Sequence, residues 1–236
     1  MILYLAMYDS DDDYLKQAPN LLRHKLRFEA ASGMPCLIRR YTEVTPAAVA
    51  RYPFRALVIS GFATGFDQLD RPGLLGICDL LHSTSLPVLG LCGGHQLIAV
   101  AFNNDFPQIE PLEDAPMRQL RPGEPDFSPD YHPGWYTETG MQSVRLLEPA
   151  DPLFAGLPET LMVLESHYCE VKRLPPGFQL LATNDNCQVQ AMRHAERPIY
   201  GTQFHPEAYT EHYSDGRRLL ENFFAMANAE SAGGVL

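Results

Sequence analysis

The stretch PVLGLCGGHQLIAVAF, Pro87 to Phe102, joins two apolar runs through a cysteine and two glycines. The first run, Pro87 to Leu91, is typical of a buried strand, and the second, His95 to Phe102, of a helix. A cysteine at such a strand–turn–helix junction stands where α/β enzymes present a nucleophile. Packing of a small apolar residue explains the same stretch, so other parts of the chain must decide between the two interpretations.

Three physical effects favour Cys92 as a nucleophile. The tight turn exposes the sulfur at the end of the strand, and Gly93 and Gly94 allow the backbone to close without a Cβ clash. The start of the following helix favours a thiolate, because its free amides carry partial positive charge. The amide of Gly93 would also face an oxyanion formed beside the sulfur. His95 follows too closely to act back on Cys92, and we place it on the first helical turn.

The composition bounds the class of protein. With 236 residues and 45% hydrophobic residues, the chain can form one large domain or two small ones around a real core. A net charge of −11 disfavours binding to a nucleic-acid backbone. The amino terminus has no basic region, and no apolar run is long enough to span a bilayer, so we expect no membrane partner.

The cysteines are odd in number and widely spaced, so they predict neither a disulfide framework nor a zinc site. A reducing cytoplasm is the location that this usage favours. The five are Cys36, Cys78, Cys92, Cys169 and Cys187.

Strand-like and helix-like segments alternate in the first half of the chain. This alternation predicts an α/β fold with a mostly parallel sheet, which binds ligands at the carboxyl ends of its strands. The expected strands are 2–8, 35–41, 55–60 and 87–91, and the expected helices are 14–32, 46–51, 74–83 and 95–102.

The second half has a different character. Seven prolines fall within 103–137, which predicts an irregular surface excursion. Tyr131, Trp135 and Tyr136 make this excursion a candidate contact surface, and a solvated loop is the alternative. A strand at 143–147 and three or four further short strands predict a small antiparallel element. A final helix begins near Ser214, and a loose tail ends the chain.

The stretch IYGTQFHPE, Ile199 to Glu207, supplies the base that a catalytic cysteine needs. An apolar strand delivers His205 at its end, close enough in principle to reach a cysteine at the end of a neighbouring strand. Glu207 would hold one imidazole nitrogen so that the other faces the sulfur. Taken alone, a surface histidine beside a turn proline explains the same residues.

Taken together, GLCGGHQ at 90–96 and QFHPE at 203–207 resemble the class I (triad) glutamine amidotransferases, among them the glutaminase domain of GMP synthetase. The resemblance covers about residues 1–225. It implies a flavodoxin-like α/β fold in a single domain, 1–228, followed by the tail 229–236. It also implies hydrolysis of the glutamine side-chain amide without a cofactor or metal. Cys92 is then the nucleophile, His205 the base and Glu207 the residue that orients it.

The resemblance extends to a loop after an earlier strand. In the family, a backbone N–H of this loop stabilises the oxyanion together with the N–H that corresponds to Gly93. Here that loop is SGFATGF, 60–66. Gly61 matches the first glycine of the family pattern, whereas Phe62 and Ala63 stand in place of a glycine and a proline. A positive φ at Phe62 would be costly, and its side chain would crowd the pocket.

The resemblance also assigns the contacts to substrate. Gln96 matches a glutamine that helps to hold it, and Ser166, His167 and Tyr168 match the segment that binds the α-amino and α-carboxylate groups. The GMP synthetase glutaminases have Gly-Asp where this chain has Tyr168 and Cys169. We interpret Cys169 as a buried strand residue.

Three functions remain open on the sequence. Because the family motifs extend almost to the end of the sequence, we expect a separate synthetase to receive the ammonia. A stand-alone hydrolase of γ-glutamyl amides or peptides is the alternative enzyme, favoured by the unusual loop at Phe62. A non-catalytic domain on the same scaffold is the third, and the intact triad argues against it.

Overall fold

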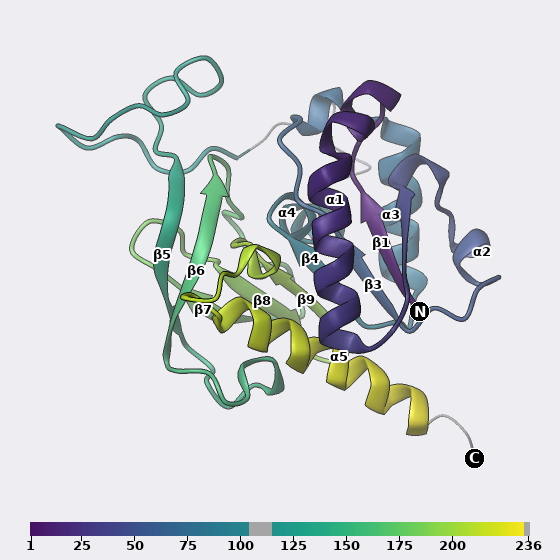
Figure 1. The fold of residues 1–236 in the computed structure, drawn as a ribbon. Coiled ribbons are helices and arrows are strands. Elements are labelled where there is room, and N and C mark those ends of the chain that lie inside the picture. Colours follow the sequence, from purple (N-terminus) through teal and green to yellow (C-terminus); the bar gives the residue numbers. More distant parts are fainter. Residues whose placement is uncertain (104–114, 234–236) are drawn as a thin grey trace.

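A computed structural model describes residues 1–103 and 115–233. One sheet of nine strands runs through it in the order β2-β1-β3-β4-β9-β8-β7-β5-β6 (Figure 1). In chain order the strands are β1 Ile2–Ala6, β2 Cys36–Arg40, β3 Ala56–Ile59, β4 Val88–Leu91, β5 Glu138–Leu146, β6 Thr160–His167, β7 Phe178–Thr183, β8 Ala191–His194 and β9 Ile199–Thr202.

The sheet changes direction at β9. From β2 through β1, β3 and β4 to β9, every neighbouring pair is parallel. From β9 through β8, β7 and β5 to β6, every pair is antiparallel. The expected α/β class is confirmed, but the antiparallel strands are more than a small element, since they form half of this continuous sheet. Every residue of β1, β3, β4 and β9 is buried, as befits strands covered on both faces.

Helices cover both faces of the parallel half. The described residues form five α-helices: α1 Asp11–Ser32, α2 Pro46–Val49, α3 Arg71–Ser83, α4 Gly93–Phe102 and α5 Asp215–Gly233. Apolar side chains of α1 and α5 pack into one core with one face of the sheet, and those of α3 and α4 into a second core with the other face. Figure 1 shows α1 and α5 side by side in front of the sheet.

The helix termini follow from local sequence. Ser10 caps α1 by accepting a hydrogen bond from the amide of Asp13 at 3.1 Å, so the helix begins three residues before the expected 14. Asp70 caps α3 in the same way, accepting from the amide of Gly73 at 2.7 Å. At the other end of the chain, α5 follows Ser214 and continues to Gly233, into the segment that we expected to be a tail.

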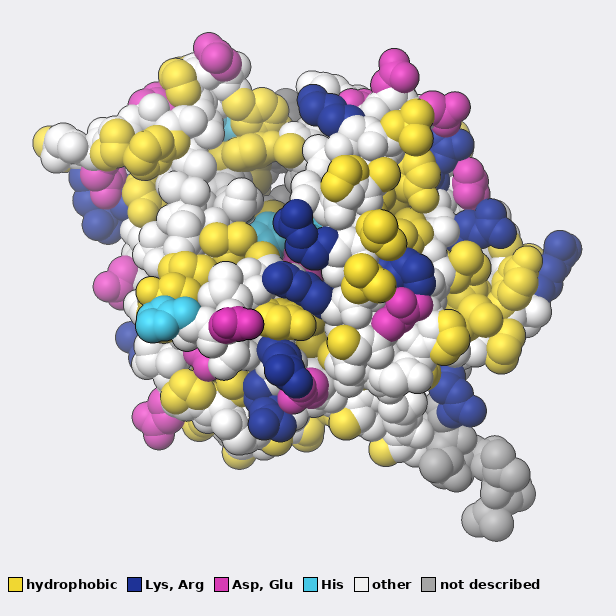
Figure 2. Space-filling model, viewed as in Figure 1, with side chains coloured by type: hydrophobic (Ala, Val, Ile, Leu, Met, Phe, Trp, Pro, Cys, Tyr) yellow, Lys and Arg dark blue, Asp and Glu magenta, His cyan; other side chains and the backbone are white. Residues whose placement is uncertain are grey.

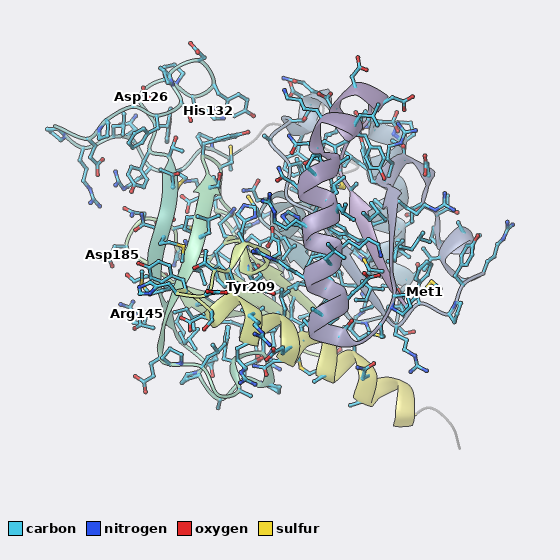
Figure 3. The ribbon with its side chains drawn as sticks, viewed as in Figure 1. Met1, Asp126, His132, Arg145, Asp185 and Tyr209 are labelled. Carbon is cyan, nitrogen blue, oxygen red and sulfur yellow. The ribbon has the colours of Figure 1, made fainter. Side chains whose placement is uncertain are left out.

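The described part of the excursion, 115–137, folds beside the ends of β5 and β6. It pairs with the segment after β6 through a bridge between Pro116 and Cys169, and it closes on itself through a bridge between Gln119 and Trp135. Asp126 and His132 lie on this excursion, beyond the tips of the two strands (Figure 3). The rest of the excursion, 104–114, lies outside the described residues. No helix in the described parts of the chain has the length and apolar character needed to cross a membrane.

Candidate active site

Cys92 occupies a strained turn between β4 and α4. Its φ of 50° and ψ of −106° make it the one non-glycine residue with a positive φ among those described. The glycines that follow are required by close packing, because a Cβ on Gly94 would lie 2.6 Å from the carbonyl oxygen of Ile59. Strain of this kind is held in place only by rigid surroundings, and it presents the side chain at the carboxyl end of the strand.

His205 reaches the same edge of the sheet from the neighbouring strand. β9 pairs with β4 so that Leu91 lies opposite Thr202, which brings the residues after each strand together. The amide of His205 donates to the carbonyl oxygen of Leu164 at 2.9 Å, which fixes its backbone on β6 as well. A short 3₁₀ helix, η4 (Pro206–Ala208), then returns Glu207 to the histidine.

Glu207 is buried and forms an ion pair with the partly buried His205. His205 Nδ1 lies 2.7 Å from Glu207 Oε1, and the glutamate side chain is 2% exposed. Burial alone would lower the pKa of His205, but the charges of Glu207 and Cys92, with hydrogen bonds to both, raise it well above its usual value. Burial likewise opposes the charged form of Glu207, but the charge and hydrogen bond of His205 lower its pKa below the usual value. The pair therefore holds an imidazolium against a carboxylate beside Cys92.

A cavity of about 250 Å³ opens beside this group. Its walls come from the loop after β3, the start of α4, the excursion and the segment after β6, with Cys92 on its surface. Six of the residues assigned to the site from sequence lie on it, and the full lining is Phe62, Ala63, Thr64, Cys92, Gln96, Ser128, Thr137, Thr139, Ser166, His167, Tyr168 and Cys169.

Gly61 lies between His205 and Cys92. A Cβ at this position would be 3.0 Å from Cε1 of His205 and 3.2 Å from Cβ of Cys92. The next residue, Phe62, covers the start of α4, because a Cβ on Gly93 would lie 2.6 Å from its ring. Phe62 does not have a positive φ, so the costly backbone conformation considered from the sequence does not arise there. The use of the Gly61, Phe62 and Gly93 amides for an oxyanion stays a prediction.

Tyr168 spans the mouth of the cavity. Its hydroxyl donates to the carbonyl oxygen of Ala63 at 2.5 Å, and its ring centroid lies 4.6 Å from that of Tyr131 on the excursion. A glycine at this position could make neither contact. Cys169 is buried as expected, but it lies beyond β6, where its sulfur is 3.6 Å from Nε2 of His132.

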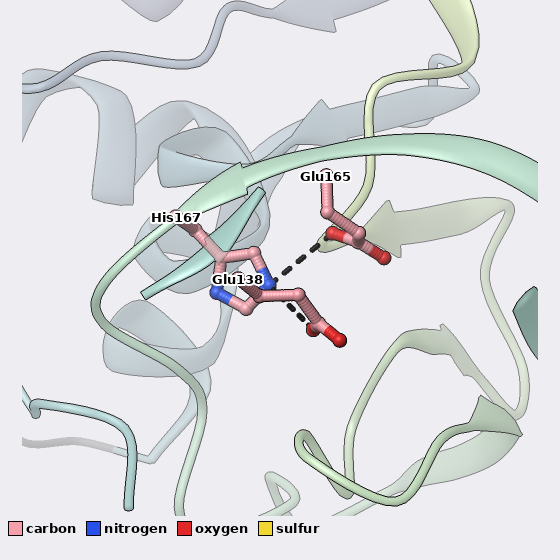
Figure 4. Close-up of side chains that lie close together, drawn as sticks. All are labelled: Glu138, Glu165 and His167. Atoms are coloured by element: carbon pink, nitrogen blue, oxygen red, sulfur yellow. Dashed lines mark hydrogen bonds and ion pairs between the residues drawn. The ribbon is translucent and has the colours of Figure 1, made fainter. Parts of the chain in front are cut away.

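His167 lies between two buried glutamates that the sequence did not indicate (Figure 4). Its Nε2 is 3.1 Å from Glu138 Oε2 and 3.2 Å from Glu165 Oε2, and its Nδ1 is 2.9 Å from the carbonyl oxygen of Cys169. Burial opposes the charged ring, but the two carboxylates, with a smaller effect of Cys92, raise the pKa of His167 to about 10.

These three side chains are also the group in the described ranges whose spacing could hold a metal ion. The pKa of Glu138 is lowered, since His167 and the side-chain amides of Asn184 and Asn186 outweigh its burial. Burial dominates at Glu165 and raises its pKa. The raised pKa of His167 favours a protonated ring, which places a positive charge between the two carboxylates.

Gln96 and Gln203 link Cys92 to this cluster. Gln203 is fully buried, and its Nε2 lies 3.6 Å from the sulfur of Cys92. Gln96 Nε2 lies 3.2 Å from Gln203 Oε1 and 2.8 Å from the carbonyl oxygen of Cys169. Gln203 stands inside the QFHPE motif, so its position was visible in the sequence although its contact was not. Contact of Gln96, Ser166, His167 and Tyr168 with substrate stays a prediction.

His95 is separate from the reacting group, as expected from its place on the first turn of α4. It is fully buried, and its Nε2 lies 3.1 Å from the carbonyl oxygen of Val189. Burial lowers its pKa to about 3, so this imidazole is neutral and serves as a core residue.

Comparison with known proteins places this geometry in a family. The model of the glutamine amidotransferase class-I family matches residues 13–227. A glutamine-hydrolysing GMP synthase subunit of Archaeoglobus fulgidus is 38% identical over 160 residues, 67% of this chain and 70% of its own length. The corresponding Pyrococcus furiosus protein is 40% identical over 140 residues, 59% of each chain, so the match spans about three fifths of such relatives.

Solved structures agree on the fold. A Thermoplasma acidophilum protein, also assigned to GMP synthase, superposes with a TM-score of 0.70 at 25% identity, over 98% of this chain and 96% of its own. The glutaminase domain of a Trypanosoma brucei CTPS superposes with a TM-score of 0.65 at 16% identity, over 97% of this chain and 93% of its own, which shows the fold alone. The strand–Cys92–helix turn, the His205–Glu207 pair and the family model together show that this chain belongs to the class I glutamine amidotransferases.

Proposed function

We propose that the chain hydrolyses the side-chain amide of glutamine and releases glutamate and ammonia. The observation that carries this is the meeting of Cys92 with the His205–Glu207 pair at the carboxyl ends of the adjacent strands β4 and β9, beside a cavity. A thiolate beside an imidazolium, with a carboxylate behind the ring, is suited to acyl transfer from an amide.

In the first half-reaction, the Cys92 sulfur forms a bond to the amide carbon and the carbonyl oxygen becomes an oxyanion. The amides of Gly93 and of the loop at Gly61 and Phe62 are our candidates to stabilise that charge. When the C–N bond breaks, the imidazolium of His205 gives its proton to the leaving nitrogen. Ammonia departs, and a γ-glutamyl thioester remains on Cys92.

In the second half-reaction, the now neutral His205 takes a proton from water as the oxygen attacks the thioester. The C–S bond breaks, glutamate leaves, and the thiolate and imidazolium are restored. Glu207 holds Nδ1 of the ring at 2.7 Å throughout, so that the other ring nitrogen exchanges the proton.

We assign the consumption of ammonia to a separate synthetase. The sequence relatives named above are each one subunit of GMP synthase, and the face shown in Figure 2 supports a partner here. Lysine and arginine side chains gather along its middle, although the chain has a net charge of −11. Beside them, Leu15, Leu22 and Leu26 of α1 are each more than half exposed. A protein with acidic and apolar residues on its docking face would fit this surface.

We also assign the protein to the cytoplasm. Support comes from the cysteines, since none of the five forms a disulfide in the structure.

The test is an assay of the purified chain on glutamine, on γ-glutamyl amides and on γ-glutamyl peptides, with and without candidate synthetases. We expect glutamate and ammonia from glutamine, loss of turnover in Cys92→Ala, and loss of labelling by a glutamine-derived electrophile in that variant. Cys78→Ala removes a buried thiol from α3 that does not line the cavity, and it serves as the matched control. Cleavage of γ-glutamyl peptides without glutaminase activity would establish the alternative hydrolase.

A further inference from the structure

We propose that Gln203 is a further catalytic residue, whose side-chain amide donates an N–H to the sulfur of Cys92 and stabilises the thiolate. The inference rests on the nucleophilic role proposed for Cys92. Gln203 follows β9, directly before Phe204 and His205, and its side chain is fully buried with Nε2 3.6 Å from the sulfur. A hydrogen bond to an ionised acceptor is stronger than one to a neutral acceptor, so this contact favours the thiolate over the thiol.

The surroundings of the amide settle which of its ends faces the sulfur. The carbonyl oxygen of Cys169 can only accept, so the atom of Gln96 that lies 2.8 Å from it is the donating nitrogen. That same nitrogen lies 3.2 Å from the Gln203 amide, which must therefore offer its oxygen to Gln96. The nitrogen of Gln203 is left to face Cys92. If the side-chain amide of Gln203 were reversed, its NH₂ group would face the NH₂ group of Gln96, and its oxygen would face the negatively charged sulfur.

The carbonyl oxygen of Cys169, from which this assignment starts, is held in place by a second contact. The carbonyl oxygen of Cys169 also lies 2.9 Å from Nδ1 of His167, whose other nitrogen lies between Glu138 and Glu165. The backbone of Gln203 is held as well, because its main-chain N–H donates to the carbonyl oxygen of Gln190 at 2.8 Å. The buried cluster thus acts as an anchor, and Gln96 is the residue that positions Gln203.

The sulfur also lies 3.8 Å from the carbonyl oxygen of Ser166. A thiol can donate its proton to that oxygen, whereas a thiolate cannot. Once the proton has passed to His205, the Gln203 N–H still stabilises the sulfur, together with the imidazolium of His205 and the start of α4. Gln203 therefore stabilises the thiolate form of Cys92 and not the thiol form. A residue that only packs against the sulfur would not distinguish the two forms.

The test is the pH dependence of Cys92 alkylation by iodoacetamide, followed by mass spectrometry of the peptide that contains it. In Gln203→Leu, we expect the half-maximal rate to move upward by about one pH unit. In the near-isosteric Gln203→Glu it should move further, because a carboxylate repels the thiolate. Glutamine turnover at neutral pH should fall by about tenfold in Gln203→Leu. Thr202→Val is the matched control, since it removes a buried hydrogen bond to the carbonyl oxygen of Phe204 but does not touch the sulfur.

An unchanged alkylation profile in both Gln203 variants, with folding verified by urea unfolding, would overturn the inference. If Gln203→Leu fails to fold, Gln203→Glu decides alone, because it preserves the size of the side chain. The alkylation readout does not depend on glutamine. A wild-type chain that hydrolyses no glutamine, yet whose profile moves in the variants, would refute the proposed function and leave the role of Gln203 standing.

Discussion

Tyr168 and Ala63 are joined across the mouth of the cavity, with the tyrosine hydroxyl donating to the alanine carbonyl oxygen at 2.5 Å. The bond connects the segment after β6 to the loop after β3, whose Phe62 covers the start of α4. Both segments line the cavity that holds Cys92. This hydrogen bond therefore joins two walls of the cavity.

Replacing Tyr168 by phenylalanine removes this bond and keeps the ring. We expect KM for glutamine to rise by up to about tenfold with a smaller change in kcat, because the bond shapes the pocket and does not touch the nucleophile. Activity on larger γ-glutamyl amides should rise relative to glutamine. Steady-state kinetics on both substrates provide the measurement, with the exposed Tyr52→Phe as control. Equal kinetic constants in the variant and the wild type would show that the bond does not limit access.

Replacing Glu207 by glutamine removes the charge that holds His205 protonated. We expect kcat/KM to fall by about 100-fold, since the imidazole loses its orientation and its basicity together. The carboxylate raises the pKa of His205, so its loss should also move the alkaline limb of the pH–rate profile toward lower pH. Glu196→Gln, on an exposed turn, is the control. An alkaline limb that stays in place would show that Glu207 does not set the basicity of His205.

Replacing Gly61 by alanine places a methyl group between base and nucleophile, 3.0 Å from the His205 ring and 3.2 Å from Cβ of Cys92. We expect a loss of about 100-fold in kcat, because a displacement of even a few tenths of an ångström spoils proton transfer. Gly76→Ala in α3 is the comparison, since its methyl group would meet the Val44 carbonyl oxygen at 3.3 Å, away from the site. A fully active Gly61→Ala variant would mean that the site is looser than the structure indicates.

The cluster around His167 predicts a dependence of stability on pH. The folded pKa of His167 is raised to about 10, so its contribution is fully present below the ordinary histidine pKa and is lost as the pH rises toward about 10. Urea unfolding between pH 7 and 10 should show stability falling more steeply in the wild type than in His167→Asn. The exposed His212→Asn should behave like the wild type. Parallel slopes for His167→Asn and the wild type would mean that the ring is neutral.

The backbone turn at Cys92 could be predicted from sequence because its causes are local, whereas its proposed chemistry needed the second motif at His205. An apolar strand, a cysteine and two glycines determine a backbone that few other sequences would adopt, and the His205 motif is equally compact. The continuation of the antiparallel strands into the same sheet could not be predicted, since it depends on β9 pairing with both β4 and β8.

The glutamates beside His167 were missed for a different reason. Along β6, alternate residues face inward, and the buried positions are Leu161, Val163, Glu165 and His167. A glutamate and a histidine at successive core positions of an alternating strand are a signal of a buried ion pair. The partner, Glu138, begins β5 and becomes a neighbour only through the register that pairs it with His167. The orientation of Gln203 depends on Gln96 and Cys169 and requires the assembled structure.

The place of β9 in the sheet has a consequence for how the chain folds. β9 follows the other eight strands of this sheet in the sequence and lies between β4 and β8, so the parallel and antiparallel halves join only through residues 199–202. Contacts that close over such long stretches of sequence form slowly. The strand that joins the two halves of the sheet is therefore also the strand that brings His205, the proposed base, to Cys92.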